Sequence, residues 1–555
     1  MATGRRWSEQ EPPLRVKKRL IVCCDGTWMN SDYGYVKPSP LSGKGGLQVP
    51  SNVTRISRCF KRRCDDGTLQ IINYESGVGS GSSVLDGIRG GVFGVGLAER
   101  VREAYAYLCA NYTDGDEIYL VGFSRGAFTV RSVAGMIGSL GLLTRQGVEH
   151  FYPIFKDMQH WMDDRYEDPF PRCPFPNKPK GRRAAERYRE RLLRRGLTRV
   201  EQRTGELITI KAVCVWDTVG SLGIPRIPWL EKLGIRPSND EYWHDTALSD
   251  RIEHAFQALA LDETRSPFSP AVWERPWKVR VRTDLRQVWF PGNHGNCGGG
   301  WDDQGMSDVT LACAAASGMM DQMSSVGVEF EPLALHRIVQ QSVGFYTNPP
   351  RQSAKQGRRR RARWAVDAIY TRNHPVRPWA LGAIQKASNL LYSFAGEATR
   401  TPGMYRQVDP ETQLQTGKFL QHTSESVHSS VRVRLACEGL GLNDDSTWTC
   451  QALSGWQLER VTVITSEPAQ APCRGVYCED DGDRKHELDK VEERWMWTYV
   501  GDERDGTDGM EMWEERLGPY ERLLLDLSGG APNVYEYAGK RMDKQRRRRP
   551  RSRGG

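Results

Sequence analysis

Short, continuous apolar runs recur along the N-terminal part of the chain and predict strands buried on both faces of a parallel sheet. These runs are 18–24, 69–74, 117–121, 207–216 and 285–290. The segments between them predict helices over 52–60, 97–112 and 127–137, and a further helix is expected over 250–262. This alternation of strands and helices predicts an α/β fold with a mostly parallel sheet and helices on both of its faces.

At 555 residues the chain exceeds the usual limit of one hydrophobic core, so we expect a large domain with additions. We divide it into a disordered N-terminus (1–17), a catalytic domain (18–330), a mainly helical and irregular C-terminal cap (331–540) with a basic loop at 355–363, and a disordered basic tail (541–555). An insertion at about 151–199 is rich in Arg, Pro and aromatic residues, a composition typical of a lid.

Composition indicates a folded protein, because 38% of the residues are hydrophobic and 17 are tryptophan. No apolar run approaches the roughly 18 residues of a membrane span. The first twenty residues lack the apolar core of a secretory signal, so we expect an intracellular, cytoplasmic protein. The 13 cysteines show no repeated metal-binding spacing, and the adjacent Cys23 and Cys24 lie in an apolar run, which favours buried thiols.

The net charge of +9 is concentrated in arginine-rich runs at 180–183, 357–363 and 546–551. Such runs can contact nucleic acid or an anionic membrane, but a solvated loop or tail is the more frequent explanation. No nucleic-acid fold signature accompanies them, so a nucleic-acid partner is not expected. Peripheral contact with an anionic membrane and the oligomeric state both stay open.

The motif Gly122-Phe-Ser124-Arg-Gly126 lies between a predicted strand and a predicted helix. A nucleophilic serine is presented on a turn of this kind, where the glycines avoid steric clashes around a strained backbone. The positive end of the following helix dipole points back at the serine. Ser124 is therefore the candidate nucleophile.

Acidic and histidine residues follow the predicted strands, at the sheet edge where α/β proteins bind ligands. Asp25 and Asp217 each end a strand, and Asp217 is equally compatible with a helix N-cap. His254 and Asp262 lie at the predicted helix over 250–262 and are rival catalytic candidates. His294 lies in a glycine-rich loop directly after a strand, which favours a catalytic role over a structural one.

Three other chemistries fit the sequence less well. The Asp25-Gly-Thr turn ends the signature of aspartyl-phosphate phosphatases, but Cys23 occupies the position of their nucleophilic aspartate. The string Gly292-Asn-His294 resembles a loop of dinuclear metallophosphatases, but the other ligand loops are missing upstream. The glycine-rich run at 77–96 lacks the dinucleotide-binding spacing. We therefore expect neither a metal nor an organic cofactor.

Five ordered blocks between about residues 19 and 327 closely resemble the domain of unknown function 2235 family, which shares its catalytic domain with a class of type VI secretion phospholipase effectors and is common in fungi. The blocks begin at Asp25, Gly122, Val215, His254 and Trp289. The resemblance implies an α/β hydrolase whose Ser-Asp-His triad falls on Ser124, Asp217 and His294. It leaves Asp25, His254 and Asp262 as candidates for the substrate pocket.

The last block departs from the bacterial pattern, which commonly has His-Ser-Asp-x-Gly-Gly where this chain has Asn at position 296. Residues after about 331 also resemble fungal members, and nothing in them suggests chemistry.

These residues predict a serine hydrolase that cleaves carboxylic esters, of lipase or phospholipase type, through a covalent acyl-enzyme. Backbone N–H groups of Arg125 and of the turn at Gly26 and Thr27 would stabilise the oxyanion. A lipid or another acyl ester is the expected substrate. The alternative is an inactive scaffold that binds protein or nucleic acid through its basic surfaces, with a metallophosphatase as the weaker third hypothesis.

Overall fold

The structure is a computed structural model of the 555-residue chain. It describes residues 16–26, 35–36, 46–47, 49–77, 92–219, 248–276, 282–312, 319–347, 377, 379–385, 396–409, 415–439, 441, 446–465, 490–501, 507, 509–527 and 531–548. The predicted basic loop at 355–363 lies outside these residues, as do 1–15 of the predicted disordered N-terminus and 549–555 of the predicted tail.

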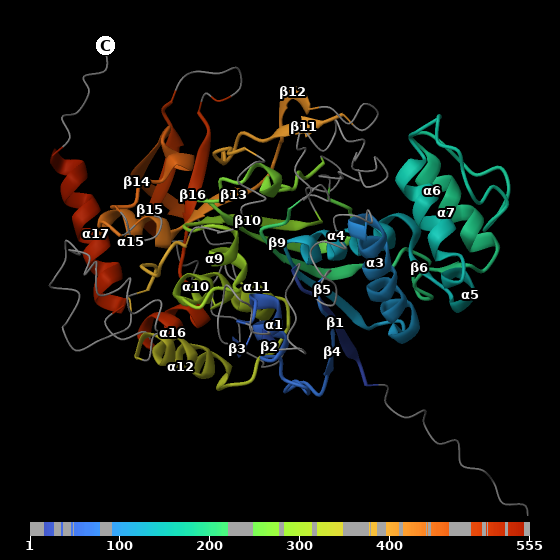
Figure 1. The fold of residues 1–555 in the computed structure, drawn as a ribbon, viewed down its shortest axis with the longest axis horizontal. Coiled ribbons are helices and arrows are strands. Elements are labelled where there is room, and N and C mark those ends of the chain that lie inside the picture. The colour runs from blue at the N-terminus through green and yellow to red at the C-terminus, as the bar shows by residue number, and fades with distance from the viewer. Residues whose placement is uncertain are drawn as a thin grey trace, which may run out of the picture.

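A ten-stranded sheet runs through the molecule (Figure 1) in the order β4-β1-β5-β8-β9-β10-β13-β16-β15-β14. The strands are parallel from β4 to β16, and β15 and β14 add an antiparallel edge. Their bounds are β1 (Lys18–Cys24), β4 (Leu69–Glu75), β5 (Glu117–Phe123), β8 (Ile210–Trp216), β9 (Ile252–Ala260), β10 (Asp284–Phe290), β13 (Glu425–His428), β14 (Trp456–Thr465), β15 (Lys490–Tyr499) and β16 (Glu511–Glu515). The predicted α/β fold with a mostly parallel sheet is confirmed.

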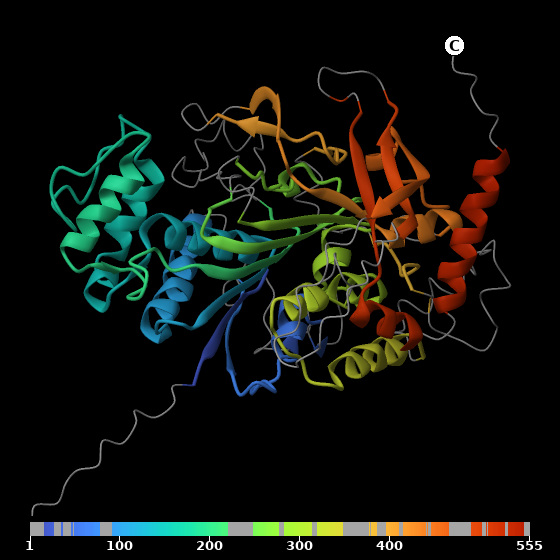
Figure 2. The same cartoon turned by 180° about the vertical axis from the view of Figure 1, so that it is seen from behind.

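Helices cover both faces of this sheet (Figure 2). One face carries α3 (Val92–Asn111) and α4 (Arg125–Leu140), and the other carries α1 (Asn52–Ser57), α10 (Gly305–Ala312), α11 (Met319–Ser325), α12 (Ala334–Thr347) and α16 (Pro519–Leu527). Alternate strand residues explain the two layers. Leu20 and Val22 pack in the core under α3 and α4, whereas Ile21 and Cys23 pack in the core of the opposite face. All four are fully buried, as expected of a strand inside a parallel sheet.

The predicted helix over 250–262 is wrong, because these residues form the strand β9. It pairs in parallel register with β8 on one side and β10 on the other. Its run Ala255-Phe-Gln-Ala-Leu-Ala260 is buried along its length, and a continuous apolar run fits a buried strand as well as a buried helix. Pairing with two neighbouring strands decides between these alternatives.

The C-terminal region is not the mainly helical and irregular cap that we expected. It supplies β13, β14, β15 and β16 to the same sheet, together with α15 (Ser429–Ala436) and α17 (Ala531–Arg548). The buried guanidinium of Arg432 pairs with Glu514, which fixes α15 to β16. The predicted disordered tail is also wrong over 541–548, because α17 continues to Arg548 and Arg541 donates hydrogen bonds to Glu438 and Tyr537.

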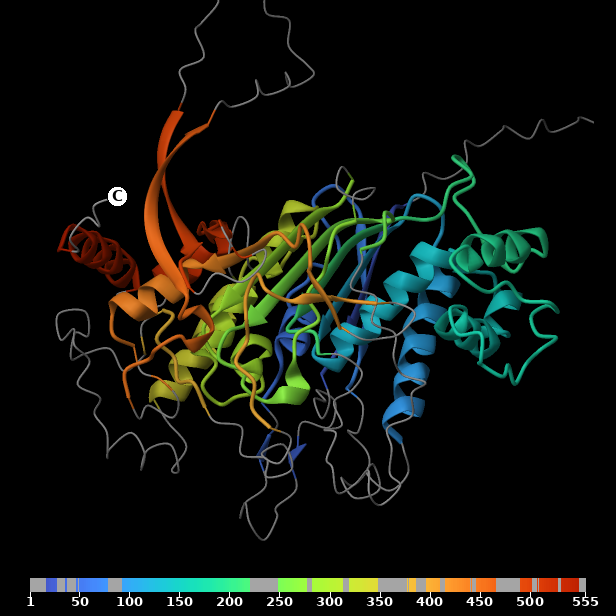
Figure 3. The ribbon, with the colours of Figure 1, turned by 90° about the horizontal axis from the view of Figure 1, so that it is seen from above.

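The insertion forms a lobe beside α3 and α4 (Figures 1 and 3). It contains α6 (Phe151–His160) and α7 (Ala184–Arg194), preceded by α5 (Arg145–Val148), and β6 (Leu142–Leu143) pairs with β7 (Thr198–Arg199) at its base. Arg189 donates to the carbonyl of Ser139, which lies about 20 Å along α4 from Ser124. The insertion therefore braces the remote end of α4, which is not the position expected of a lid over Ser124.

The remaining elements are short. They are β2 (Tyr35–Val36), β3 (Gly46–Leu47), β11 (Arg406–Val408), β12 (Gln415–Phe419), α9 (His294–Gly298), η2 (Ser266–Phe268) and η4 (Gln451–Leu453). Within the described part of the chain, no helix combines the length and apolarity needed to cross a bilayer.

A buried carboxyl between α11 and α16 makes the stability of this fold depend on pH. Asp321 accepts hydrogen bonds from the backbone N–H groups of Tyr520 and Glu521. Burial, reinforced by the charge of Glu521 and opposed by those donors, raises the pKa of Asp321 to about 7. The folded protein therefore keeps this proton up to about pH 7, whereas the unfolded chain releases it near pH 4.

Between these two pH values the folded protein binds one more proton than the unfolded chain, so its stability falls as pH rises. The contribution of Asp321 to the free energy of unfolding should fall between about pH 4 and pH 7, by at most about 4 kcal/mol. Asp321→Asn removes this contribution. In urea denaturation, the free energy of unfolding of the variant minus that of the parent should therefore be larger at pH 8 than at pH 4. The matched control is Asp526→Asn, at an exposed position on α16. Parallel pH profiles for parent and Asp321→Asn would contradict the prediction.

Candidate functional site

Ser124 lies at the carboxyl end of β5, on a strained turn that leads directly into α4. Its backbone has φ 57° and ψ −122°, a conformation that residues with a side chain rarely adopt. Its N–H donates to the carbonyl of Trp216 at 3.1 Å, so the pairing of β5 with β8 continues up to the turn. The strand-to-helix setting predicted for Ser124 is thus present, with the side chain next to the first turn of α4.

The two glycines of the motif allow this turn because the surrounding backbone leaves no room for a Cβ atom. A Cβ at Gly126 would lie 2.2 Å from the carbonyl oxygen of Cys24, and one at Gly122 would lie 2.6 Å from the carbonyl oxygen of Gly126. The close approach of Gly126 to the end of β1 places the start of α4 directly beside the turn at Asp25.

Asp217 ends the neighbouring strand β8 and is fully buried. It also has a positive φ, of 40°, and its N–H donates to the carbonyl of Ala258 at 2.7 Å. Its Oδ2 lies 2.6 Å from Nδ1 of His294, and its Oδ1 accepts from the N–H of Ala260 at 3.1 Å. Asp217 could equally have been a helix N-cap on its sequence, but its carboxylate contacts His294 instead.

His294 is the first residue of the short helix α9, which follows β10. Asn293 caps this helix in a reciprocal capping box with Asn296. The imidazole packs against the ring of Phe123 at a centroid distance of 4.6 Å and edge-on to Phe268 at 4.9 Å. Phe123 immediately precedes Ser124. The imidazole of His294, which contacts Asp217, therefore also lies beside the turn that carries Ser124.

Arg400 reaches the same site from the C-terminal region, in which no motif indicated chemistry. Its guanidinium donates to both carboxylate oxygens of Asp217, and also to the carbonyls of Ala260 at 2.8 Å and Phe268 at 2.7 Å. Burial opposes ionisation of Asp217, but Arg400 and His294 more than offset it and hold the pKa of the carboxyl below its ordinary value. A lone arginine in an irregular segment carries no periodic signal, so only the fold identifies it.

The side chain of Asp25 supports the turn after β1. Its buried carboxylate accepts hydrogen bonds from Ser51 at 2.7 Å, Thr54 at 2.8 Å and Tyr74 at 2.7 Å. The N–H of Gly26 also donates to this carboxylate at 2.7 Å. The Asp25 side chain therefore ties the turn to α1 and β4.

The other two predicted pocket residues, Asp262 and His254, lie in different surroundings. Asp262 is buried and accepts hydrogen bonds from the N–H of Gly292 at 2.6 Å and Nε1 of Trp448 at 2.9 Å, so it anchors the segment that leads to His294. His254 lies near the amino end of β9, 3.5 Å from Asp284, and about 20 Å along the strand from Ala260. His254 therefore lies far from Ser124 and outside the site.

The structure describes two of the three predicted oxyanion donors, Arg125 and Gly26. Arg125 is the first residue of α4, so its N–H lies at the positive end of the helix dipole beside Ser124. The N–H of Gly26 points instead to its own neighbour Asp25. Thr27 lies outside the described residues.

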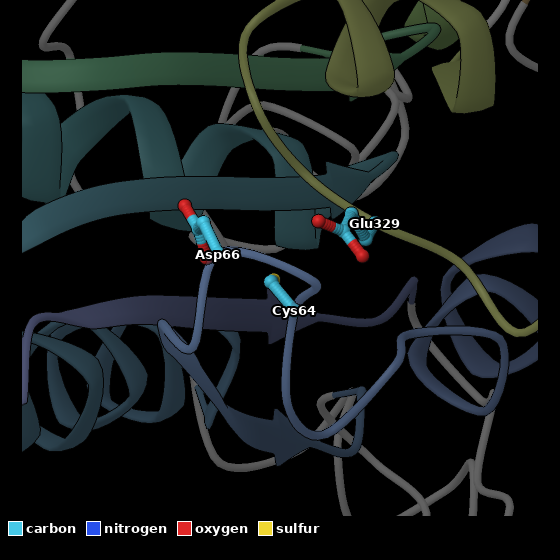
Figure 4. A group of neighbouring side chains, drawn as sticks. All are labelled: Cys64, Asp66 and Glu329. Atoms are coloured by element: carbon cyan, nitrogen blue, oxygen red, sulfur yellow. The ribbon is translucent and has the colours of Figure 1, made fainter.

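A group of possible metal ligands lies elsewhere, near the amino ends of β1 and β4 (Figure 4). The ligand atoms of Cys64, Asp66 and Glu329 lie within 4.8 Å of one another. Arg19 already donates to Cys64 and Asp66, and Lys61 pairs with Glu329 at 3.0 Å. We assign this group to an ion-pair network that joins the loop before β4 to the segment before α12.

Comparison with known proteins places this site within a family. Residues 18–320 match the family described as "T6SS, Phospholipase effector Tle1-like, catalytic domain". The chain belongs to this family. The matched segment contains Ser124, Asp217 and His294, whereas Arg400 lies beyond its end.

Individual relatives are distant. An uncharacterized protein of Saccharomyces cerevisiae, YEL023C, is 26% identical over 265 residues, which cover 45% of this chain and 32% of the yeast protein. The structure of the Tle1 effector bound to the VgrG spike is 17% identical, with a TM-score of 0.27, over 55% of this chain and 56% of that one. An uncharacterized Pseudomonas aeruginosa protein is 16% identical, with a TM-score of 0.26, over 52% and 43% of the two chains. The match thus spans about a third of the yeast relative.

The departure at Asn296 from the pattern of bacterial relatives has a local explanation. The amide oxygen accepts from the N–H of Asn293 at 3.2 Å, while the amide nitrogen donates to the carbonyl of Ala383 at 2.9 Å. An ionised carboxylate has no proton for the second bond. Asn296 thus joins the helix of His294 to the C-terminal region.

The close packing of Gly126 against β1 yields a test of the serine turn. Gly126→Ala should destabilise the protein by about 1–3 kcal/mol or more, because the added methyl would overlap backbone atoms that cannot move independently. Gly344→Ala is the control, since a Cβ there meets no atom within 4 Å and alanine favours the helix α12. Thermal and urea denaturation of both variants provide the comparison. Equal stability of Gly126→Ala and the parent would show that the turn tolerates a side chain.

Proposed function

We propose that the protein is a serine hydrolase that cleaves carboxylic esters of lipids, in the manner of a phospholipase or lipase. The observation that carries this proposal is the contact between Nδ1 of His294 and the buried carboxylate of Asp217 at 2.6 Å, beside a strained turn that presents Ser124. Membership of a family named for phospholipase effectors supports a lipid substrate.

In the proposed reaction, Nε2 of His294 takes the hydroxyl proton of Ser124 as the serine oxygen attacks the ester carbonyl carbon. The N–H of Arg125 donates to the oxyanion of the tetrahedral intermediate. Collapse of the intermediate expels the alcohol, which receives the proton from His294, and leaves an acyl group on Ser124. Water then attacks the acyl-enzyme in the same way, and the released carboxylic acid restores the free serine.

The surroundings of Asp217 suit the role of the triad acid. Its Oδ2 lies 2.6 Å from Nδ1 of His294, and in the proposed mechanism this contact selects the tautomer with the proton on Nδ1, so that Nε2 is the basic nitrogen. Its lowered pKa keeps the carboxylate charged, so that it can stabilise the imidazolium formed during each proton transfer. Phe123 and Phe268 pack on two sides of the imidazole and restrict its rotation.

A lipid substrate requires the protein to meet a membrane or micelle surface. We propose peripheral contact with anionic membranes, because the sequence contains arginine-rich runs at 357–363 and 546–551. Binding to anionic vesicles should then weaken as salt rises, while hydrolysis of a soluble short-chain ester is unaffected.

Substitution of the nucleophile tests the reaction type. Ser124→Ala should abolish ester hydrolysis and covalent labelling by a fluorophosphonate probe, because the oxygen that attacks the carbonyl is gone. Its denaturation midpoint should stay close to that of the parent, because only one hydroxyl is lost at a turn. Turnover near the parental level would sink the serine mechanism. Loss of parental activity in a chelator, with recovery on adding a divalent ion, would favour metal-dependent hydrolysis instead.

A pair of isosteric substitutions separates the triad acid from the structural acid. Asp217→Asn should lower kcat by about 10⁴-fold, because an amide favours the wrong tautomer and cannot stabilise the imidazolium. Asp262→Asn should affect stability more than kcat, because Asp262 only anchors the backbone of Gly292 and the indole of Trp448. Kinetics with a soluble ester and urea denaturation of both variants decide the matter. A reversal of the two outcomes would assign the acid to Asp262.

A further inference from the structure

The segment that carries Arg400 is fixed to the site by backbone pairing. The N–H of Ser266 donates to the carbonyl of Gly396 at 3.1 Å, and the N–H of Ala398 donates to the carbonyl of Thr264 at 2.8 Å. This pairing places the Arg400 side chain under the turn that also carries Phe268. Only 4% of the residue is exposed, so its guanidinium is held within the protein and not on a solvated surface.

The guanidinium fixes the plane of the Asp217 carboxylate. Arg400 donates one N–H to each carboxylate oxygen, a paired geometry that a lysine cannot reproduce. The same two nitrogens are anchored by the carbonyls of Ala260 and Phe268. Because Oδ2 also contacts Nδ1 of His294, any rotation of the carboxylate would break the contact with the histidine.

The charge of Arg400 also acts on the histidine. Among the residues that the structure describes, two ion pairs lie beside His294. Asp217 contacts its ring and pairs with Arg400. Glu263 accepts from its backbone N–H at 3.3 Å and pairs with Arg265 at 2.8 Å. The buried thiol of Cys297 lies on the same short helix. Each carboxylate thus has its own guanidinium, so the charges beside the imidazole are paired.

We propose that Arg400 is a positioning residue of the hydrolase site, supplied by the C-terminal region. It holds the Asp217 carboxylate in the plane that orients His294, and its positive charge lies against both oxygens of that carboxylate, one of which contacts the imidazole. This proposal rests on the proposed serine hydrolase function. It extends the site beyond residues 18–320, the segment that matches the family.

Steady-state kinetics of the full-length chain test this role with Arg400→Lys and Arg400→Met. The control is Arg432→Lys, because Arg432 is equally buried and pairs with Glu514 but has no contact with Asp217 or His294 among its hydrogen bonds. Hydrolysis of a soluble short-chain ester and the rate of fluorophosphonate labelling are measured across pH, with rates normalised to the folded fraction.

Arg400→Lys should lower kcat about tenfold or more, because lysine cannot donate to both carboxylate oxygens of Asp217 in the paired geometry. The acid limb of the pH profile should change little, because lysine keeps the positive charge. Arg400→Met should lower kcat similarly and move the acid limb of kcat/KM to higher pH by about one unit, because an unopposed Asp217 favours the protonated imidazole. Arg432→Lys should change neither. If Arg400→Met does not fold, the comparison of kcat between Arg400→Lys and Arg432→Lys decides the proposal, which requires a loss in the first variant and none in the second.

A parental kcat and acid limb in both Arg400 variants would overturn the proposal, as would an equal loss in Arg432→Lys. A second readout does not require hydrolysis. In the Ser124→Ala background, NMR titration of isotope-labelled His294 should show a higher titration midpoint with Arg400→Met than with Arg400 intact, and an unchanged midpoint would overturn the proposal. Absence of parental hydrolysis and labelling would instead refute the serine hydrolase function, while the titration would still report on Arg400.

Discussion

A buried carboxylate at Asp217 is the constraint around which this structure is arranged. Transfer of an ionised carboxyl from water into a protein interior costs several kcal/mol unless its oxygens find donors. Here the donors come from parts of the chain that are far apart: the N–H of Ala260 after β9, the imidazole of His294 after β10, and the guanidinium of Arg400. Satisfying this one charge therefore requires the parallel strands and the C-terminal segment to meet at a single edge.

Two other buried carboxyl groups near the site, those of Asp25 and Asp262, are satisfied by different kinds of donor from those of Asp217. Asp25 and Asp262 are buried at the same edge of the sheet, yet among the described residues their hydrogen-bond donors are backbone N–H groups and neutral side chains. Burial raises the pKa of both groups despite these donors, whereas Asp217 is shifted in the other direction. Three acids that look alike in sequence thus divide into two supports for turns and one charged partner for a histidine.

Much of the fold and the principal candidate residues of the site could be predicted because their signals are local. The strand over 18–24 and the turn at Ser124 depend on a continuous apolar run and on glycines within a few residues. The strand β9 could not be distinguished from a helix, because a short buried run fits either element. Only its pairing with β8 and β10, which are distant in sequence, makes it a strand. Arg400 could not be found at all, because nothing within its own segment indicates that its partner lies 183 residues away.

The parallel pairing of β13 with β10 also changes how the boundary of the family match should be understood. The match ends at residue 320, but the sheet continues past β10 into β13 and β16 without a break in its hydrogen bonding. A fragment cut at that residue would leave the backbone of β10 unpaired where Gln287–Trp289 now pair with β13, and an unpaired strand edge is a template for association between molecules. The segment that matches the family is therefore shorter than the stretch of chain that builds the sheet.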